Sequence, residues 1–299
     1  MMRGGPIFAA LAMALLPLRA TAAPLKVVAT FTILADMVRQ VAGPHADVIS
    51  LVGPGGDAHT FDPSPADAGK LTDADLIFAN GLGLDAWIAR LATSADFKGR
   101  LITASSDVTP REMTEAVGGV SRLVTDPHAW QDPRNGGLYI RAIALALTRA
   151  DAPHAADYTR AADALVAELE ALDVDARKRL ASIPPERRKL ITSHDAFGYF
   201  GSAYGVELLA PEGISTDQEP SAGAVARLID QIRAEHIRAV FIENMGNARL
   251  IDSIRADTGI ASGGTLYSDS LSTPDGPAPS YLTMLRYNIG RFVAAMTGT

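Results

Sequence analysis

Short apolar segments alternate with amphipathic ones along the first half of the chain. Leu25–Thr30 is rich in β-branched residues and predicts a strand, as do Asp47–Val52 and Leu76–Ala79. Ser64-Pro65 followed by Asp67 predicts the start of a helix, because serine caps the first turn, proline fits it, and an acid lies at the positive end of the helix dipole. An earlier helix is predicted from apolar residues at helical spacing: Ile33, Leu34, Met37, Val38 and Val41. Strands alternating with helices predict a parallel sheet with covered faces.

The same alternation returns in the second half of the chain. Four strands are predicted there, at Leu190–Ser193, Val206–Leu209, Ala239–Glu243 and Thr265–Tyr267. Helices are predicted at Ser221–Glu235 and Asn247–Thr258, and a last helix starts near Ser280 and ends before Gly298. The apolar face of this last helix consists of Tyr281, Met284, Leu285, Ile289, Phe292 and Val293. We therefore expect two α/β halves of similar plan.

The segment between the halves, His154–Ser182, has a different pattern. It is rich in alanine and leucine, contains neither glycine nor proline, and ends before Pro184-Pro185. As one helix it would be roughly 40 Å long, about the length of a domain. We interpret it as a rigid helix that joins two lobes; the alternative is a long surface helix that belongs to one lobe. Its apolar positions include Leu165, Leu169, Leu172 and Val174.

The first 23 residues have the pattern of a secretory signal peptide. Arg3 precedes an apolar run from Ile7 to Leu18, and Ala20-Thr21-Ala22 has the small-x-small pattern of a cleavage site. The run is too short to span a membrane comfortably. A short buried helix is also disfavoured, because Pro17, Arg19 and Pro24 would interrupt it. We therefore expect a protein exported to the periplasm, with an N-terminal lobe at 24–153, a connecting helix at 154–182 and a C-terminal lobe at 183–299.

Composition narrows the function classes. A chain of 299 residues is usually divided into two domains. Its net charge of −7 argues against binding nucleic acid and leaves no basic face for anionic lipid. The absence of cysteine excludes disulfides and a lipid-modified cysteine, so that a metal site would use histidine, carboxylate or carbonyl ligands. We expect a freely soluble monomer that does not insert into the membrane.

Four residues far apart in the sequence are candidate metal ligands. His59 lies in the glycine- and proline-rich loop Gly53–Pro63 and His128 directly precedes a predicted helix, while His194 and Asp269 each follow a predicted strand. Ligands of open α/β sheets bind beyond the carboxyl ends of the strands. Three imidazoles and a carboxylate are a suitable tetrahedral set for zinc. Spacing alone does not show that the four meet, and a residue in any one of these settings is more often a hydrogen-bonded loop residue than a metal ligand.

The sequence around these residues resembles the zinc/manganese class of solute-binding proteins of bacterial ABC importers. The matching stretches occur in the family's order: Gly56–Pro65, Asp126–Trp130, Thr192–Phe200 and Tyr267–Ser270. The resemblance implies two α/β lobes with small, mostly parallel sheets, joined by one backbone helix, and a metal ion in the cleft between them. It also implies delivery of the ion to a membrane permease and its ATPase. The implied ligands are His59 and His128 from the first lobe and His194 and Asp269 from the second.

The third ligand position bears on which metal is bound. In the family it resembles, glutamate at this position goes with manganese receptors, whereas histidine is typical of zinc receptors. Here it is His194, and imidazole in place of a carboxylate favours Zn²⁺ over Mn²⁺. Many zinc receptors of the family also have a long histidine-rich loop before the second ligand, but the corresponding stretch Asp107–Thr125 is short and lacks histidine. We therefore expect Zn²⁺, with a manganese or mixed-metal receptor as the alternative.

Other polar residues near the ligands have less specific patterns. Polar groups are needed to orient the imidazoles, but the pattern singles out none of the candidates, which are Asp57, Asp62, Asp126, Asp195, Glu219, Glu243 and Asn244. The three remaining histidines, His45, His154 and His236, are expected in turns or at helix ends.

A more distant alternative is a zinc-dependent hydrolase or hydratase. Three histidines with an open fourth position would suit it, because a zinc-bound water is a nucleophile near neutral pH. However, Asp269 would fill the fourth position, and no His-Glu-x-x-His motif supplies a base. Ser193-His194-Asp195 is no catalytic triad, because adjacent residues of an extended chain point to opposite sides. We therefore do not expect an enzyme. A receptor for an organic ligand would need a more aromatic cleft than two tryptophans suggest.

Overall fold

The computed structural model describes residues 23–298 except 118–119, 218–219, 236 and 247. The predicted signal peptide, apart from its last residue, and Glu219 and His236 lie outside the described residues. Within the described part of the chain, no helix combines the length and the apolar character that crossing a membrane requires. The strands form two four-stranded parallel sheets and one antiparallel hairpin.

The N-terminal sheet has the strand order β2-β1-β3-β4. Its strands are β1 (Leu25–Ala29), β2 (Ala46–Ser50), β3 (Leu76–Ala79) and β4 (Arg100–Thr103), and its connecting helices are α1 (Thr32–Ala42), α2 (Pro65–Thr72) and α3 (Trp87–Ser94). The start of α2 confirms the prediction from the sequence, because Ser64 and Asp67 form a reciprocal capping box around Pro65. All four residues of β3 are buried, as expected for a central parallel strand.

The C-terminal sheet has the order β10-β9-β7-β8 and is also parallel. Its strands are β7 (Lys189–Ile191), β8 (Glu207–Leu209), β9 (Ala239–Glu243) and β10 (Ala261–Leu266), with the helices α6 (Gly198–Tyr204), α7 (Ala222–Glu235) and α8 (Ala248–Thr258). The strand β7 ends at Ile191, two residues earlier than predicted, so Thr192 and Ser193 lie in the loop that leads to His194.

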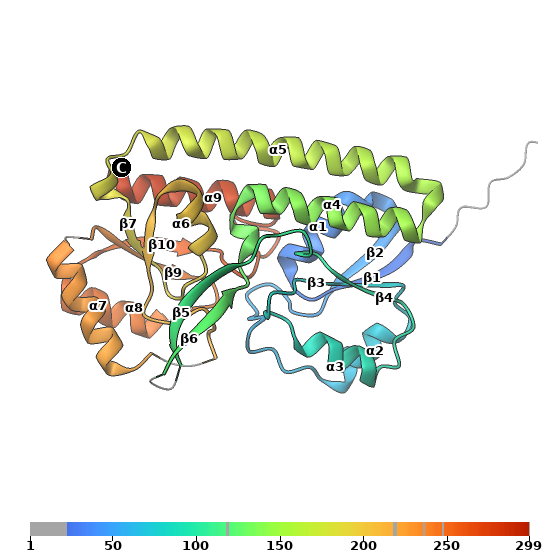
Figure 1. Cartoon of the computed structure of the whole chain (residues 1–299), viewed down its shortest axis with the longest axis horizontal. Helices are drawn as coiled ribbons and strands as arrows, with labels where there is room; N and C mark the ends of the chain where they lie inside the picture. Colours follow the sequence, from blue (N-terminus) through green and yellow to red (C-terminus); the bar gives the residue numbers. More distant parts are fainter. Residues whose placement is uncertain (1–22, 118–119, 218–219, 236, 247, 299) are drawn as a thin grey trace, which may run out of the picture.

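Three long helices lie along one side of the molecule: α4 (Pro133–Ala150), α5 (Ala155–Ala181) and α9 (Tyr281–Thr297). Helix α5 extends over both halves, α9 lies beside the C-terminal half and α4 beside the N-terminal half (Figure 1). The 27-residue α5 confirms the predicted long helix, and it packs against α4, α1 and α9. One hydrophobic core continues beneath these helices from the N-terminal sheet to Phe241 and Phe292 in the C-terminal half. The lobe boundaries at 153/154 and 182/183 stay a prediction.

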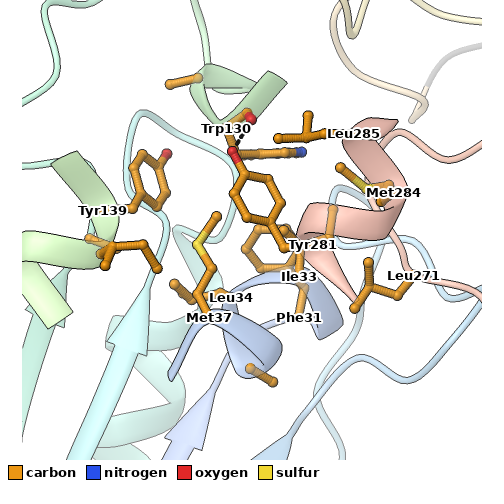
Figure 2. Packing of buried hydrophobic residues seen from close by; sticks show 14 of the residues in the cluster. Phe31, Ile33, Leu34, Met37, Trp130, Tyr139, Leu271, Tyr281, Met284 and Leu285 are labelled. Atoms are coloured by element: carbon orange, nitrogen blue, oxygen red, sulfur yellow. Dashed lines mark hydrogen bonds between the residues drawn. The ribbon is translucent and has the colours of Figure 1, made fainter. Parts of the chain in front are cut away.

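Trp130 and Tyr281 pack together at the centre of this core (Figure 2), and Trp130 also links two of the candidate ligand loops. Trp130, two residues after His128, is fully buried, and its Nε1 donates a hydrogen bond of 2.9 Å to Ser268 O. The Tyr281 hydroxyl at the start of α9 donates a hydrogen bond of 2.5 Å to Trp130 O. The carbonyl of Ser268 directly precedes Asp269, so packing in the core fixes the loops of His128 and Asp269 relative to each other.

The sequence pattern does not predict the edge strand β4 or the hairpin of β5 (Arg111–Val117) and β6 (Val120–Asp126). The stretch Asp107–Thr125, which takes the place of the family's long histidine-rich loop, mostly forms this hairpin, which lies between the two sheets in Figure 1. Its strands carry charged and polar residues at many positions, so they lack the apolar run that marked the other strands.

Candidate metal centre

His59 lies in the loop between β2 and α2 in the N-terminal half. The Trp87 indole donates a hydrogen bond of 3.1 Å to the carbonyl of Ala58, and Asp57 Oδ1 accepts one of 2.8 Å from the His59 backbone N–H. These bonds fix the backbone on both sides of the imidazole. The His59 side chain is 5% exposed, whereas the other three candidate ligands have fully buried side chains.

His128 lies between β6 and α4, directly before the short 3₁₀ helix Ala129–Gln131. Asp126 Oδ1 accepts hydrogen bonds from both the backbone N–H of His128, at 3.0 Å, and its ring Nδ1, at 2.9 Å. The carboxylate therefore keeps a proton on Nδ1 and leaves Nε2 facing the other candidate ligands.

His194 lies in the loop after β7 and is oriented in a similar way by Glu243 at the end of β9. Glu243 Oε1 accepts hydrogen bonds from the backbone N–H groups of Ser193, at 2.8 Å, and His194, at 3.0 Å. Glu243 Oε2 lies 2.5 Å from His194 Nδ1 in an ion-pair contact that lacks hydrogen-bond geometry. The predicted placement of His194 and Asp269 after strands is confirmed, because Asp269 follows β10 in the same way.

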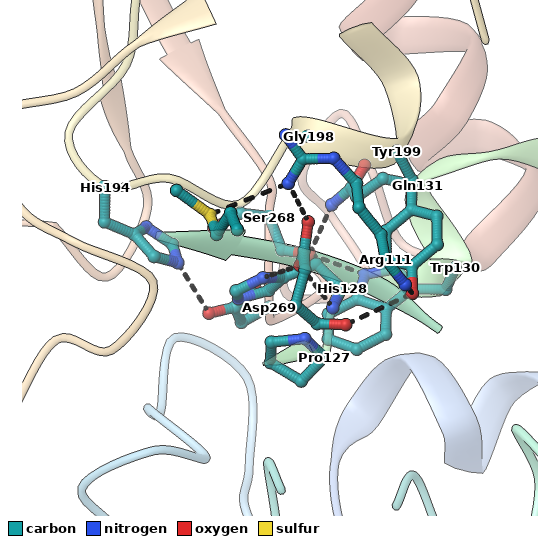
Figure 3. A network of polar contacts seen from close by, with 12 residues as sticks. Arg111, Pro127, His128, Trp130, Gln131, His194, Gly198, Tyr199, Ser268 and Asp269 are labelled. Carbon is teal, nitrogen blue, oxygen red and sulfur yellow. Dashed lines mark hydrogen bonds and ion pairs between the residues drawn. The ribbon is translucent and has the colours of Figure 1, made fainter. Parts of the chain in front are cut away.

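The four side chains meet at one point. His59 Nε2 lies 3.1 Å from His128 Nε2 and 3.3 Å from Asp269 Oδ2. His194 Nε2 lies 3.1 Å from Asp269 Oδ2, and His128 Nε2 lies 3.6 Å from Asp269 Oδ1 (Figure 3). One donor atom from each residue lies within 4.8 Å of all the others. Ligands at 2.0–2.2 Å from a tetrahedral zinc ion are about 3.3–3.6 Å apart, so this spacing fits a divalent ion.

The electrostatics of the cluster also favour a cation. Burial opposes the charged form of His128, but the charges of Asp269 and Asp126 raise its pKa to about 9. Burial likewise opposes the charge of His194, whose pKa is nevertheless raised well above its usual value by Glu243 and Asp269. Burial would raise the pKa of Asp269, but the charges of His194 and His128 hold it well below the usual value. Neither carboxylate oxygen of Asp269 has a hydrogen-bond partner, as expected for atoms that face an ion.

The acidic candidates have different positions. Asp126 and Glu243 contact the imidazoles, whereas Asp62 is exposed and Asp195 is partly buried. Asp57 accepts hydrogen bonds from the His59 backbone and, at 2.5 Å, from the hydroxyl of Thr216 in the C-terminal half. Sequence reasoning missed Thr216, because no pattern relates it to a residue 159 positions away.

Two histidines outside the cluster have the structural roles expected of them. His45 lies in the short 3₁₀ helix Gly43–His45, and His154 directly precedes α5. Their rings stack with centroids 3.8 Å apart, and His45 Nε2 contacts Asp157 at 3.1 Å. Neither belongs to the group of converging donors.

The fold and the buried group of three histidines and one aspartate match a known family. The fold has two parallel sheets flanked by helices, one of which is 27 residues long. Residues 27–295 match the family described as "ZnuA: Zinc-uptake complex component A periplasmic". The chain belongs to this family. It is therefore a periplasmic metal-binding component of metal-uptake ABC importers, and this family consists of transporter components rather than enzymes.

Relatives in the family are named for several metals. The iron-binding protein YfeA of Yersinia pestis is 37% identical over 270 residues, which are 90% of this chain and 85% of that protein. The manganese-binding lipoprotein MntA of Halalkalibacterium halodurans is 29% identical over 274 residues, 91% and 89% of the two chains. The solved structure of the periplasmic zinc binding protein TroA from Treponema pallidum has a TM-score of 0.83 and 29% identity, covering 91% of this chain and 99% of that chain. Family membership thus confirms the fold and the receptor class and leaves the metal open.

Proposed function

We propose that the protein captures a divalent transition-metal ion with His59, His128, His194 and Asp269 and delivers it to an ABC importer. The observation that carries the proposal is the convergence of four donor side chains from separate loops, within 4.8 Å of one another and shielded from water. Asp126 and Glu243 support the proposal. Each lies against the Nδ1 of a candidate ligand, and histidines that bind a metal typically contact a carboxylate through their other ring nitrogen.

Zn²⁺ is the ion we propose as the main cargo. Three imidazoles and one carboxylate form a relatively soft set of donors, and the contacts of 3.1–3.3 Å among His59, His128, His194 and Asp269 Oδ2 suit short bonds to zinc. A manganese or mixed-metal receptor is the second candidate, and one observation favours it. Both oxygens of Asp269 face imidazoles, so the carboxylate can supply two ligand atoms and a fifth bond.

We further propose that the protein works as a soluble periplasmic monomer with two lobes divided at the boundaries given above. The relative MntA is named a lipoprotein, but the 299 residues of this chain contain no cysteine to which such a lipid could be attached. The partners we propose are a membrane permease, which receives the ion, and its ATPase. Neither nucleic acid nor direct insertion into the membrane is part of this function.

The proposal is tested by the metal content of the protein and by competition between ions. The protein is purified without chelator and analysed for its elements, and the metal-free form is then titrated with Zn²⁺ and Mn²⁺ in competition. We expect one ion per chain and a preference for Zn²⁺. A preference for Mn²⁺ would support the second candidate. Failure to bind either ion more tightly than an unrelated protein does would overturn the proposal.

A further inference from the structure

An ion pair lies on the Nδ1 side of the His128 ring. Asp126 accepts the Nδ1 hydrogen bond of His128 with Oδ1, and its other oxygen, Oδ2, accepts a hydrogen bond of 3.0 Å from Arg111 Nη1 (Figure 3). The Asp126 side chain is fully buried, whereas the Arg111 side chain is 30% exposed. A buried carboxylate without a compensating charge is costly, so Arg111 helps to keep Asp126 in this place.

The base of the β5–β6 hairpin brings this pair together. Arg111 is the first residue of β5 and Asp126 the last of β6, and the two are direct partners in the antiparallel register. The hydroxyl of Tyr199, in α6 of the C-terminal half, accepts a hydrogen bond of 2.7 Å from the Arg111 backbone N–H and donates one of 3.3 Å to Asp126 O. Both strands of the hairpin are therefore held by one side chain from the opposite half.

The first residue of α6 leaves no room beside the ion pair. A Cβ atom on Gly198 would lie 2.6 Å from Asp126 Oδ2 and would overlap the guanidinium of Arg111. Arg111 and Asp126 are thus in contact with the backbone of the C-terminal half at a position where only glycine fits without displacing them.

We propose that Arg111 is a positioning residue for the metal site, which holds the carboxylate that orients His128 while Gly198 and Tyr199 hold the ion pair against the opposite half. This inference rests on the proposed metal-binding function. The charge of Arg111 and its positioning role are expected to change the metal affinity in opposite directions. A positive charge near a cation weakens binding of that cation by repulsion, so loss of the arginine charge alone would tighten metal binding. Loss of the positioning would weaken it.

The experiment compares variants of the full chain by their affinity for Zn²⁺, measured by competition with a chromophoric chelator. Arg111→Met is expected to weaken binding about tenfold, as loss of an outer contact of a metal ligand does, and Arg111→Lys to recover part of the loss. Gly198→Ala displaces the same pair without any change of charge and is also expected to weaken binding. Arg122→Met is the matched control, because it removes an exposed arginine from the other strand of the same hairpin, and its affinity should equal that of the wild type.

A second measurement separates positioning from general destabilisation. The visible spectrum of the Co²⁺-loaded protein reports the ligand geometry, and it should change in Arg111→Met and Gly198→Ala but not in Arg122→Met. If Arg111→Met does not fold, as judged by thermal unfolding of the metal-free protein, then Gly198→Ala decides. Unchanged or tighter Zn²⁺ binding together with an unchanged Co²⁺ spectrum would overturn the inference while the proposed function stands. A wild-type protein without Zn²⁺ binding, or a His128→Ala variant with unchanged binding, would instead overturn both.

Discussion

The three imidazoles of the candidate centre are supported in different ways. The rings of His128 and His194 each face a buried carboxylate through Nδ1, which fixes their orientation and makes Nε2 a stronger donor. Among the residues that the structure describes, no hydrogen bond is made to Nδ1 of His59, whose position depends on the backbone bonds of its loop. His59 is also the one candidate ligand with a measurable exposure, so it lies on the side from which an ion would approach.

Metal binding is expected to release protons near neutral pH. The pKa of His128 is raised to about 9 and that of His194 well above its usual value, so we expect both imidazoles to be protonated at pH 7 in the metal-free protein. A divalent ion must displace these protons, and about two should leave per ion bound. Affinity should therefore fall as the pH falls below about 9, the pKa of His128, because more protons must then be displaced. Calorimetry at pH 7 in two buffers of different ionisation enthalpy measures the number of protons released per ion. The same heat of binding in both buffers would contradict this expectation.

His194 is expected to set the preference between metals. His194→Glu replaces an imidazole by a carboxylate and should lower the ratio of Zn²⁺ to Mn²⁺ affinity by about tenfold or more. The new carboxylate would face Glu243, which lies 2.5 Å from the present ring, so His194→Glu with Glu243→Gln removes the repulsion between them. Competition between the two ions in both variants makes the test. An unchanged ratio in the single and the double variant would mean that selectivity lies elsewhere.

Two adjacent glycines show how closely the long helices pack at the element scale. A Cβ atom on Gly136 in α4 would lie 3.0 Å from the Tyr281 ring and would overlap its hydroxyl, whereas one on Gly137 would meet Val166 at 3.8 Å, an ordinary contact. Gly136→Ala is expected to lower the free energy of unfolding by about 1–3 kcal/mol. Gly137→Ala is the matched control and should leave it unchanged or raise it by up to about 1 kcal/mol, because alanine favours helix. Urea unfolding measures both, and equal losses in the two variants would contradict this packing.

The elements that could be predicted from the sequence are those with a strong local signal. Helix α5 could be predicted because no glycine or proline interrupts it before Pro184. Helix α2 could be predicted because the residues of its cap are neighbours in the sequence. The β5–β6 hairpin could not be predicted in this way, because its partly exposed strands contain no continuous run of apolar residues. The same reason hides Arg111, which lies 15 residues before Asp126 and is brought to it only by the hairpin register.

The residues of the site could be predicted from the sequence, but their arrangement in space could not. His59, His128, His194 and Asp269 stand out in the sequence because of their loops and their resemblance to a family. Their convergence depends on contacts made across the fold, such as Trp130 with Ser268, which no local pattern encodes.

At the scale of the whole molecule, the candidate centre is one of several contacts between the halves. Gly55 of the His59 loop donates a hydrogen bond of 2.7 Å to Ser270 Oγ beside Asp269, and Thr216 binds Asp57 across the same boundary. An ion held by all four donors would therefore join the two halves directly, and its binding to the folded state would stabilise the protein as a whole.

The affinity of the metal-free protein for Zn²⁺ tests the central claim most directly, in the wild type and in single alanine variants of His59, His128, His194 and Asp269. Each variant should weaken binding by more than the roughly 10- to 100-fold cost of losing an outer contact, because each removes a ligand. His154→Ala, which changes a histidine outside the cluster, should bind as the wild type does. Wild-type affinity in all four variants would contradict the proposed site, because it would mean that these side chains do not hold the ion.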